Sequence, residues 1–316
     1  MKLQQLRYAL EVYRHNLNVS EAADALFTSQ PGISKQIRLL EEELGIQIFI
    51  RSGKRVVSVS QPGKAVLEIS ERILRDVQNI KNIGSEFTDH DSGSLTIATT
   101  HTQARYALPK IVAEFVKNYP KVNLTIKQGS PSAIAQMVSS GEADLAIITE
   151  RIDDHPELGK LPCYEWNHAV IVPHDHPLLD CRNPLSLEDL ASFPLVTYEF
   201  AFNSGSSIAR TFNKAHIEQP DVALSAADTD VLKTYVRLGL GVGLMAKMAY
   251  DPVVDQDLQL IDAAHLFEPS PTWIALRNDT YLRGYAYDFI QMFAPKLTRE
   301  AVDRILYTPV VEDFSI

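Results

Sequence analysis

The first 30 residues alternate apolar stripes with polar turns, a pattern typical of short packed helices. A first helix, expected to end near Asn18, has apolar residues at spacings of three and four: Leu3, Leu6, Leu10, Tyr13 and Leu17. Asn18 and Glu21 have the spacing of a capping box, which predicts that a second helix begins there. Thr28 and Ser29 end that helix and cap a third, whose first turn accepts Pro31 because no intrahelical N–H is lost.

The third helix has an apolar face and a polar face. The expected buried residues are Ile33, Ile37, Leu40 and Leu44. The polar face carries Gln30, Ser34, Lys35 and Arg38. These types can reach base edges and phosphates from a helix in the major groove. A polar face alone is more often only solvated, but the short capped helix and tight turn before it favour a DNA-recognition helix.

A basic hairpin is expected directly after this helix. Residues 46–50 and 56–59 have strand character around Ser52-Gly53-Lys54, and a basic hairpin beside a recognition helix is a wing. The predicted DNA-contacting residues are Thr28, Ser29, Gln30, Pro31, Ser34, Lys35, Arg38, Arg51, Lys54 and Arg55.

A long amphipathic helix follows, capped by Ser60 and entered through Pro62. Its near-heptad stripe consists of Val66, Ile69, Ile73, Val77, Ile80 and Phe87. About 25 helical residues span roughly 38 Å. A helix of this length with one apolar side more often pairs with a copy of itself than packs on its own small domain, so we expect a homodimer.

From about residue 93 the pattern changes to apolar strands alternating with helices, which predicts an α/β fold with mostly parallel sheets. The first set of strands is expected at residues 94–99, 122–126 and 143–148. A second set runs from His168 to about Leu260, and residues 273–277 should return to the first lobe before a helix over 281–293.

Polar side chains follow two strands of the first set. The run Thr99-Thr100-His101-Thr102-Gln103 ends one strand, and Thr149 ends another. Ligands of such sheets lie beyond the carboxyl ends of the strands, where hydroxyls, amides and helix N–H groups bind anions without adding charge. A single Ser or Thr at a turn usually bonds its own backbone, but several converging from separate strands is less common. The pattern favours sulfate, or a carboxylate with an acetyl group.

Charge and composition change this picture little. The net charge is −10, but residues 1–60 hold eight basic and six acidic side chains, so they carry +2 and the remainder −12. This asymmetry supports DNA binding weakly. The N-terminus lacks a secretory pattern and no segment reaches roughly 18 apolar residues, so we expect a cytoplasmic protein without a membrane partner.

Several short patterns resemble metal-binding, redox, dinucleotide-binding or hydrolase motifs, but none has the neighbouring residues or elements that such a motif requires. Cys163 and Cys181 match neither a zinc pair nor a redox motif and are expected to be buried free thiols. The glycines of residues 239–243 follow a helix and precede a strand, the reverse of a dinucleotide fingerprint. His174 and His176 have no third ligand placed by the sequence, and no GxSxG elbow occurs. We expect no catalytic residue, no metal, no cofactor and no enzyme.

The order of the N-terminal elements resembles the LysR-type bacterial transcription regulators, and the resemblance covers essentially the whole chain. It rests on the T-S-Q-P-G-I-S-K-Q-I helix, the E-L-G-I-Q-I-F-I-R wing and the long linker helix. Residues 1–6, 97–109, 229–243 and 287–295 resemble the CysB branch of that family, which activates genes of sulfur assimilation and cysteine synthesis.

The resemblance implies an N-terminal all-α winged helix-turn-helix and an α/β effector domain of two lobes, similar to periplasmic binding proteins. The implied limits are 1–60 for the DNA-binding domain, 61–88 for the dimerisation helix and 89–316 for the effector domain. Within the effector domain, lobe I takes about 93–163 and 268–294, lobe II about 164–267, and a C-terminal tail 295–316. The implied partners are double-stranded promoter DNA, RNA polymerase and further copies of the chain, as a dimer and then a tetramer.

The resemblance also implies effector contacts. The expected residues are Thr100, His101, Thr102, Gln103, Thr149 and Asn203. Asn203 stands where the branch has a threonine, so we expect altered selectivity. The implied effector is acetylserine, sulfate or thiosulfate. One alternative is a LysR-type regulator of sulfonate or sulfate-starvation genes with another sulfur metabolite. A solute-binding protein is a weaker alternative, because it should carry a signal peptide and would not need residues 1–60.

Overall fold

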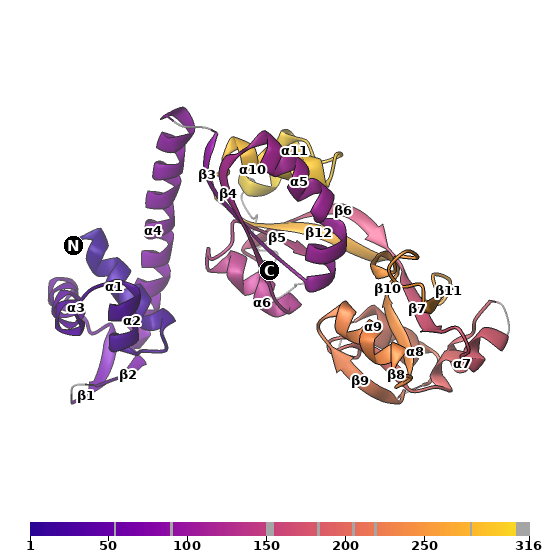
Figure 1. Ribbon diagram of the computed structural model, residues 1–316. Coiled ribbons are helices and arrows are strands. Elements are labelled where there is room, and N and C mark those ends of the chain that lie inside the picture. The colour runs from indigo at the N-terminus through magenta and orange to yellow at the C-terminus, as the bar shows by residue number, and fades with distance from the viewer. Residues whose placement is uncertain are drawn as a thin grey trace, which may run out of the picture. The chain divides into compact units, whose positions relative to one another are not determined.

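The computed structural model describes residues 1–53, 55–88, 91–149, 155–181, 184–203, 206–217, 220–278 and 280–307. The chain divides into two compact units, Met1–Thr88 and Asp89–Ile316 (Figure 1). Each unit has its own hydrophobic core, so each buries its apolar residues without the other. None of the described helices combines the length and apolar character that a membrane crossing requires.

The N-terminal unit is a winged helix-turn-helix followed by one long helix, as predicted. Its elements are α1 (Leu3–Arg14), α2 (Val19–Ala25), α3 (Gln30–Leu44), β1 (Phe49–Ser52), β2 (Arg55–Val59) and α4 (Gln61–Thr88). β1 and β2 pair as an antiparallel hairpin. Asn18 caps α2 by accepting hydrogen bonds from the Ser20 and Glu21 N–H groups, and Ser29 caps α3 by accepting one from Gly32.

The first helix differs from the prediction at its end and in its buried face. It ends at Arg14 and not near Asn18, because Asn16 and Leu17 have φ values of 51° and 68°, outside helical geometry. Leu3 and Tyr13, predicted in the buried stripe, are exposed. The buried residues are Gln5, Leu6, Ala9, Leu10 and Val12. The buried face is therefore displaced from the predicted stripe, and it includes the small residue Ala9 on the helix that packs against α3 and α4.

Lobe I of the second unit is built on a five-stranded sheet of order β4-β3-β5-β12-β6. Its elements are β3 (Ser92–Thr99), the π-helix η1 (Gln103–Ala107), α5 (Pro109–Asn118), β4 (Lys121–Gln128), α6 (Pro131–Ser139), β5 (Leu145–Ile148), β6 (Leu158–Trp166), β12 (Ser270–Arg277), α10 (Gly284–Phe293) and α11 (Arg299–Tyr307). β3 is parallel to β4 and β5, whereas β12 is antiparallel to β5 and β6. The predicted return of residues 273–277 to this lobe is confirmed.

Lobe II has a sheet of order β11-β7-β10-β8-β9. Its elements are β7 (His168–Pro173), the 3-10 helix η2 (Pro177–Asp180), α7 (Leu187–Ala191), β8 (Leu195–Tyr198), α8 (Ser207–Lys214), β9 (Val222–Ala226), α9 (Thr229–Arg237), β10 (Val242–Ala246), the 3-10 helix η3 (Lys247–Ala249) and β11 (Leu258–Asp262). β8 is parallel to β9 and β10, and β7 is antiparallel to β10 and β11. The chain passes between the lobes after β6 and again before β12 (Figure 1).

The segment expected to be a C-terminal tail contains a packed helix. α11 places Val302 and Leu306 in the core of lobe I, one helical turn apart on the same face. The two cysteines, Cys163 and Cys181, are free thiols as predicted, although both are only partly buried.

Candidate functional site

The recognition helix α3 presents one polar face to the surroundings of the N-terminal unit. Ile33, Ile37 and Leu40 are fully buried, so the opposite side of the helix faces outward. Exposed residues of the predicted set at and around this helix are Ser29, Gln30, Pro31, Lys35 and Arg38, and Ser34 and Thr28 are half-buried. Gln30 Nε2 donates to Ser34 Oγ at 3.3 Å, a contact that DNA could replace.

The wing is attached to α3 through one buried carboxylate. Glu41 accepts hydrogen bonds from the Ile48 and Phe49 N–H groups at 2.9 and 3.0 Å. Its other oxygen lies 2.8 Å from Arg51 Nη1. Arg51, expected to touch DNA, therefore has a partner within its own unit. This ion pair connects the wing to the recognition helix, and the contact of Arg51 with DNA stays a prediction.

The remaining wing residues lie at the hairpin end. Arg55 begins β2 and is exposed, and it lines one surface groove together with Gln30 of α3. Lys54, predicted at the tip, lies outside the described residues. The structure thus brings the start of the recognition helix and the wing to one face.

A cavity of about 80 Å³ lies between the two lobes of the second unit. Its lining consists of Thr100, Thr102, Gln103, Thr149, Trp166, His168, Tyr198, Phe200, Ala201, Ser206, Ser207, Ile208, Arg210, Ala246, Pro269, Ser270 and Pro271. Thr100 and Thr149 come directly after the neighbouring parallel strands β3 and β5. Four of the six residues expected to bind an effector are therefore brought together at one edge of the sheet.

Two of these four side chains are already bonded to protein groups. Thr102 Oγ1 lies 2.9 Å from Thr229 Oγ1 and 3.4 Å from the Tyr198 hydroxyl, both in lobe II. Gln103 Oε1 accepts a hydrogen bond from the Tyr164 hydroxyl at 2.6 Å. Thr102 consequently joins the lobes as well as lining the cavity.

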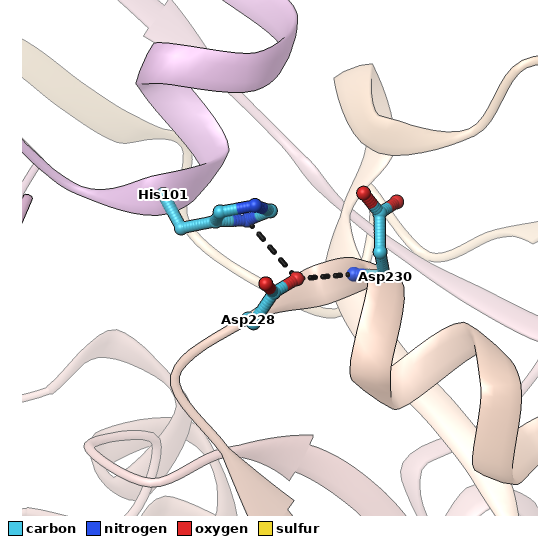
Figure 2. A group of neighbouring side chains, drawn as sticks. All are labelled: His101, Asp228 and Asp230. Atoms are coloured by element: carbon cyan, nitrogen blue, oxygen red, sulfur yellow. Dashed lines mark hydrogen bonds and ion pairs between the residues drawn. The ribbon is translucent and has the colours of Figure 1, made fainter.

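Asn203 and His101 do not line this cavity. Asn203 is exposed, and the same turn contributes Phe200, Ala201 and Ser206 to the lining in its place. His101 points to lobe II, where its Nδ1 lies 3.2 Å from Asp228 Oδ1 (Figure 2). Neither residue belongs to the lining of this cavity, so their contact with an effector stays a prediction.

The group formed by His101, Asp228 and Asp230 has ligand atoms within 4.8 Å of one another (Figure 2). Asp228 Oδ1 accepts a hydrogen bond from the Asp230 N–H at 2.7 Å. The two oxygens of Asp230 accept hydrogen bonds from the Tyr106 hydroxyl and from Arg105 Nε. Since these donors already occupy Asp230, the geometry favours a contact between the lobes over a cation site.

The same contact continues into a charged network. Lys233 Nζ donates to the Tyr106 hydroxyl at 3.3 Å and to Asp255 at 2.7 Å. Burial alone would raise the pKa of Asp230, but the hydrogen bond from Tyr106 and the charge of Lys233 outweigh it and lower the pKa. Burial and the Asp230 carboxylate raise the pKa of Tyr106. The network therefore holds fixed charges across the lobe interface at neutral pH.

The sequence analysis missed several lining residues, of which Trp166 and His168 matter most chemically. Trp166 Nε1 and His168 Nδ1 are buried and have no hydrogen-bond partner within the described part of the chain. Burial lowers the pKa of His168 to about 4, so its imidazole is neutral near pH 7. Trp166 ends β6, so the strand-end rule that found Thr149 could have found it. His168 begins the crossing strand β7, and no sequence signal marks it.

The comparisons with known proteins agree with this geometry. Residues 3–64 match the bacterial regulatory helix-turn-helix protein, lysR family, and residues 88–298 match the LysR substrate binding domain. A regulator named SsuR from Burkholderia cenocepacia is 50% identical over 306 residues, which are 97% of this chain and 99% of the relative. A CysB regulator from Haemophilus influenzae is 51% identical over 304 residues, 96% of this chain and 93% of the relative.

A solved structure extends the similarity to the second unit. The crystal structure of the cofactor-binding domain of the Cbl transcriptional regulator matches with a TM-score of 0.64 at 39% identity. The matched region covers 69% of this chain and 95% of the Cbl domain. The chain belongs to the LysR family of transcription regulators, which bind DNA and are not enzymes, and within that family it is of the CysB, SsuR and Cbl type.

Proposed function

We propose that this chain activates transcription of sulfur-assimilation and cysteine-biosynthesis genes in the cytoplasm, controlled by a small anion bound between its lobes. The effector would be of the acetylserine, sulfate or thiosulfate class. The cavity carries this proposal, because its described lining contains hydroxyl, amide and indole donors but no Asp, Glu or Lys. Calorimetric titration of the full-length protein with sulfate, thiosulfate and acetylserine tests it. Binding of none of the three would contradict the effector class.

A second candidate function is the alternative drawn from the sequence, regulation of sulfonate or sulfate-starvation genes with another sulfur metabolite as effector. The chain is 50% identical to the SsuR relative and 51% identical to the CysB relative, so identity alone does not choose between regulators of this type. Transcript profiling of a deletion strain, grown on sulfate and then on an alkanesulfonate, separates them. Loss of cysteine-biosynthesis transcripts on sulfate supports the first function. Loss confined to sulfonate-uptake transcripts supports the second.

For promoter DNA, we propose contacts from the polar face of α3, the turn before it and the wing. The proposed set is Thr28, Ser29, Gln30, Pro31, Ser34, Lys35, Arg38 and Arg55. Lys54, which lies outside the described residues, is included because of its position in the sequence of the wing. Lys35→Ala should weaken binding to all duplexes alike and reduce the slope of log K against log salt by about 1. Gln30→Ala should mainly relax sequence preference, and unchanged affinity in both variants would exclude α3 as the reader.

We further propose that residues 1–60 bind DNA, that α4 pairs two chains, and that residues 89–316 form the effector domain. Ile80 and Phe87 on α4 are 68% and 84% exposed, an apolar surface that a second copy could cover. Ile73 instead packs on the core of its own unit. Replacing Ile80 and Phe87 by Asp should convert dimers to monomers in sedimentation experiments, and unchanged assembly would place the interface elsewhere. Tetramer formation and contact with RNA polymerase belong to the same proposal.

A further inference from the structure

Arg210 is the only Lys or Arg among the described residues that line the effector cavity. The other basic side chain of the lining, His168, is 3% exposed and neutral near pH 7 because burial lowers its pKa to about 4. Since the described lining contains no carboxylate, its formal charge is positive and comes from one guanidinium. An ammonium group on a ligand would find no counter-charge there.

Arg210 lies in the part of α8 that borders the cavity. It lies on α8, whose preceding cap and first residues, Ser206, Ser207 and Ile208, also line the cavity. Its side chain is 47% exposed and lies 3.8 Å from Glu268, which Lys214 approaches at 3.1 Å. Because Lys214 also pairs with Glu268, the charge of Glu268 keeps a partner when Arg210 pairs with an anion.

The rest of the cavity offers hydrogen-bonding nitrogens. Trp166 Nε1 can only donate, and it is buried without a hydrogen-bond partner among the described residues, so an acceptor atom of a bound molecule suits it. His168 Nδ1 likewise has no partner in the described part of the chain. The volume of about 80 Å³ gives room for roughly five to eight water-sized groups. These features fit a compact molecule rich in oxygen atoms.

We propose that Arg210 forms a second anion subsite in this cavity, beside the subsite in which Trp166, Thr100 and Thr149 donate hydrogen bonds to the anion proposed above. An effector with two acidic groups and no charged amine, such as a short organic diacid or a sulfonate-carboxylate, would occupy both subsites and bind more tightly than a single anion. This inference rests on the proposed function of the cavity as the effector site.

The experiment compares ligands that differ by one carboxylate. Full-length wild type, Arg210→Gln and Lys214→Gln are titrated calorimetrically with methanesulfonate, sulfoacetate, acetate and malonate. Lys214→Gln is the matched control, because Lys214 has the same charge, helix and partner Glu268 but does not line the cavity. We expect the second acidic group to improve binding roughly three- to tenfold in wild type and Lys214→Gln, and this gain to vanish in Arg210→Gln.

The outcomes separate this inference from the proposed function. A gain that survives in Arg210→Gln, or that disappears equally in Lys214→Gln, overturns the role of Arg210. Absence of binding by all four probes also overturns the role of Arg210. The titration with sulfate, thiosulfate and acetylserine decides the proposed function separately, so the two can fail independently.

A separate observation concerns Phe27 in the turn between α2 and α3. Its side chain is 98% exposed, more than any other large hydrophobic side chain among the described residues. Its φ of 49° lies in the left-handed region, where a side chain other than that of Gly or Asn is sterically unfavourable. The next residues, Thr28 and Ser29, lead directly into the recognition helix.

At the first left-handed position after α1 and α3, the chain has residues that this conformation favours. After α2, the Phe27 N–H bonds the Asp24 carbonyl and the Thr28 N–H bonds the Ala23 carbonyl, the two bonds of a Schellman motif. The residue at the same position after α1 is Asn16, which is followed by a second left-handed residue, the half-buried Leu17, and the residue after α3 is Gly45. Phe27 therefore adds both backbone strain and an exposed apolar ring where Gly would add neither.

We infer that the Phe27 ring binds apolar surface of the DNA, either a thymine methyl or a deoxyribose, beside the bases met by the start of α3. In helix-turn-helix domains the N-terminal residues of the second helix reach base edges while the first helix crosses the backbone, so the turn lies next to the groove. Phe is among the side chains that contact the thymine methyl.

The test uses full-length protein and a duplex selected by the wild type from a random-sequence pool. Phe27→Gly should leave the melting temperature unchanged or higher, weaken DNA binding roughly three- to tenfold, and leave the salt slope unchanged, because no phosphate contact is lost. Phe27→Tyr should retain wild-type affinity. Replacing thymines by uracil assigns the methyl if wild type weakens and Phe27→Gly does not, and otherwise assigns the sugar. Wild-type affinity in Phe27→Gly would overturn the inference.

Discussion

The effector cavity and the charged network beside it both lie between the lobes, yet their chemistry is opposite. In the network, Lys233, Asp255 and Asp230 are charged and bonded to protein partners. In the cavity, Trp166 and His168 are uncharged and have buried nitrogens without partners among the residues that the structure describes. Charges that are paired stabilise one arrangement of the lobes, whereas neutral groups without a protein partner can gain one from a ligand. The difference separates the part that holds the lobes from the part that senses.

The largest expected effect comes from breaking the network at its buried centre. Asp255→Ala leaves Lys233 buried without a counter-charge and should lower the free energy of unfolding of the effector unit by about 3–5 kcal/mol. Asp257→Ala removes an exposed partner of the neighbouring Arg237 and should cost less than about 1 kcal/mol. Urea unfolding of both variants measures the difference, and similar losses would mean that burial of Asp255 is unimportant.

The next prediction concerns the protonation of His168 in the cavity. Its folded pKa of about 4 lies below the ordinary 6.5, so the unfolded chain binds the extra proton as the pH falls below 6.5. Stability is therefore full above that value and declines toward pH 4. From about pH 7.5 to about pH 5 the loss through His168 should be about 2 kcal/mol. Urea unfolding at both pH values should show a shallower decline in His168→Gln, and equal declines would mean that His168 is not desolvated.

The sequence could predict the part of the site built from one sheet, because it depends on local order alone. Thr100 and Thr149 follow parallel strands, and the hydrophobic pattern identified both strand ends. Arg210 and His168 reach the cavity only because lobe II closes on lobe I, a tertiary relation that periodicity does not encode. His101 and Thr102 are neighbours, yet one faces Asp228 and the other lines the cavity, so direction at a strand end also required the structure.

Helix ends in the N-terminal unit were similarly only partly predictable. The cap residues Asn18 and Ser29 have side chains suited to their place, and the sequence marked both. The left-handed turn at Asn16 ended α1 earlier than the apolar spacing indicated. Arg51 was assigned to DNA by its charge and position, but its pairing with Glu41 depends on how the wing folds against α3.

A smaller effect should follow from removing one hydroxyl of the cavity. Thr100→Val keeps the shape of the side chain and should weaken binding of the preferred sulfur anion by about 0.5–1.5 kcal/mol without changing the unfolding free energy comparably. Thr96→Val is the matched control, because Thr96 lies on the same strand β3 but does not line the cavity. Calorimetric affinities equal to wild type in both variants would place the anion elsewhere.

The smallest expected effect lies at Thr102, which belongs to both regions. Its hydroxyl bonds Thr229 across the lobes and also lines the cavity. A double-mutant cycle of Thr102→Val and Thr229→Val should give a coupling energy of about 0.5 kcal/mol in urea unfolding, the size of one neutral hydrogen bond. Zero coupling in stability, combined with an affinity loss like that of Thr100→Val, would assign Thr102 to the sensing cavity alone. Coupling that disappears when the effector is bound would show that the ligand takes Thr102 from the lobe contact, so that effector binding itself weakens the closure between the lobes.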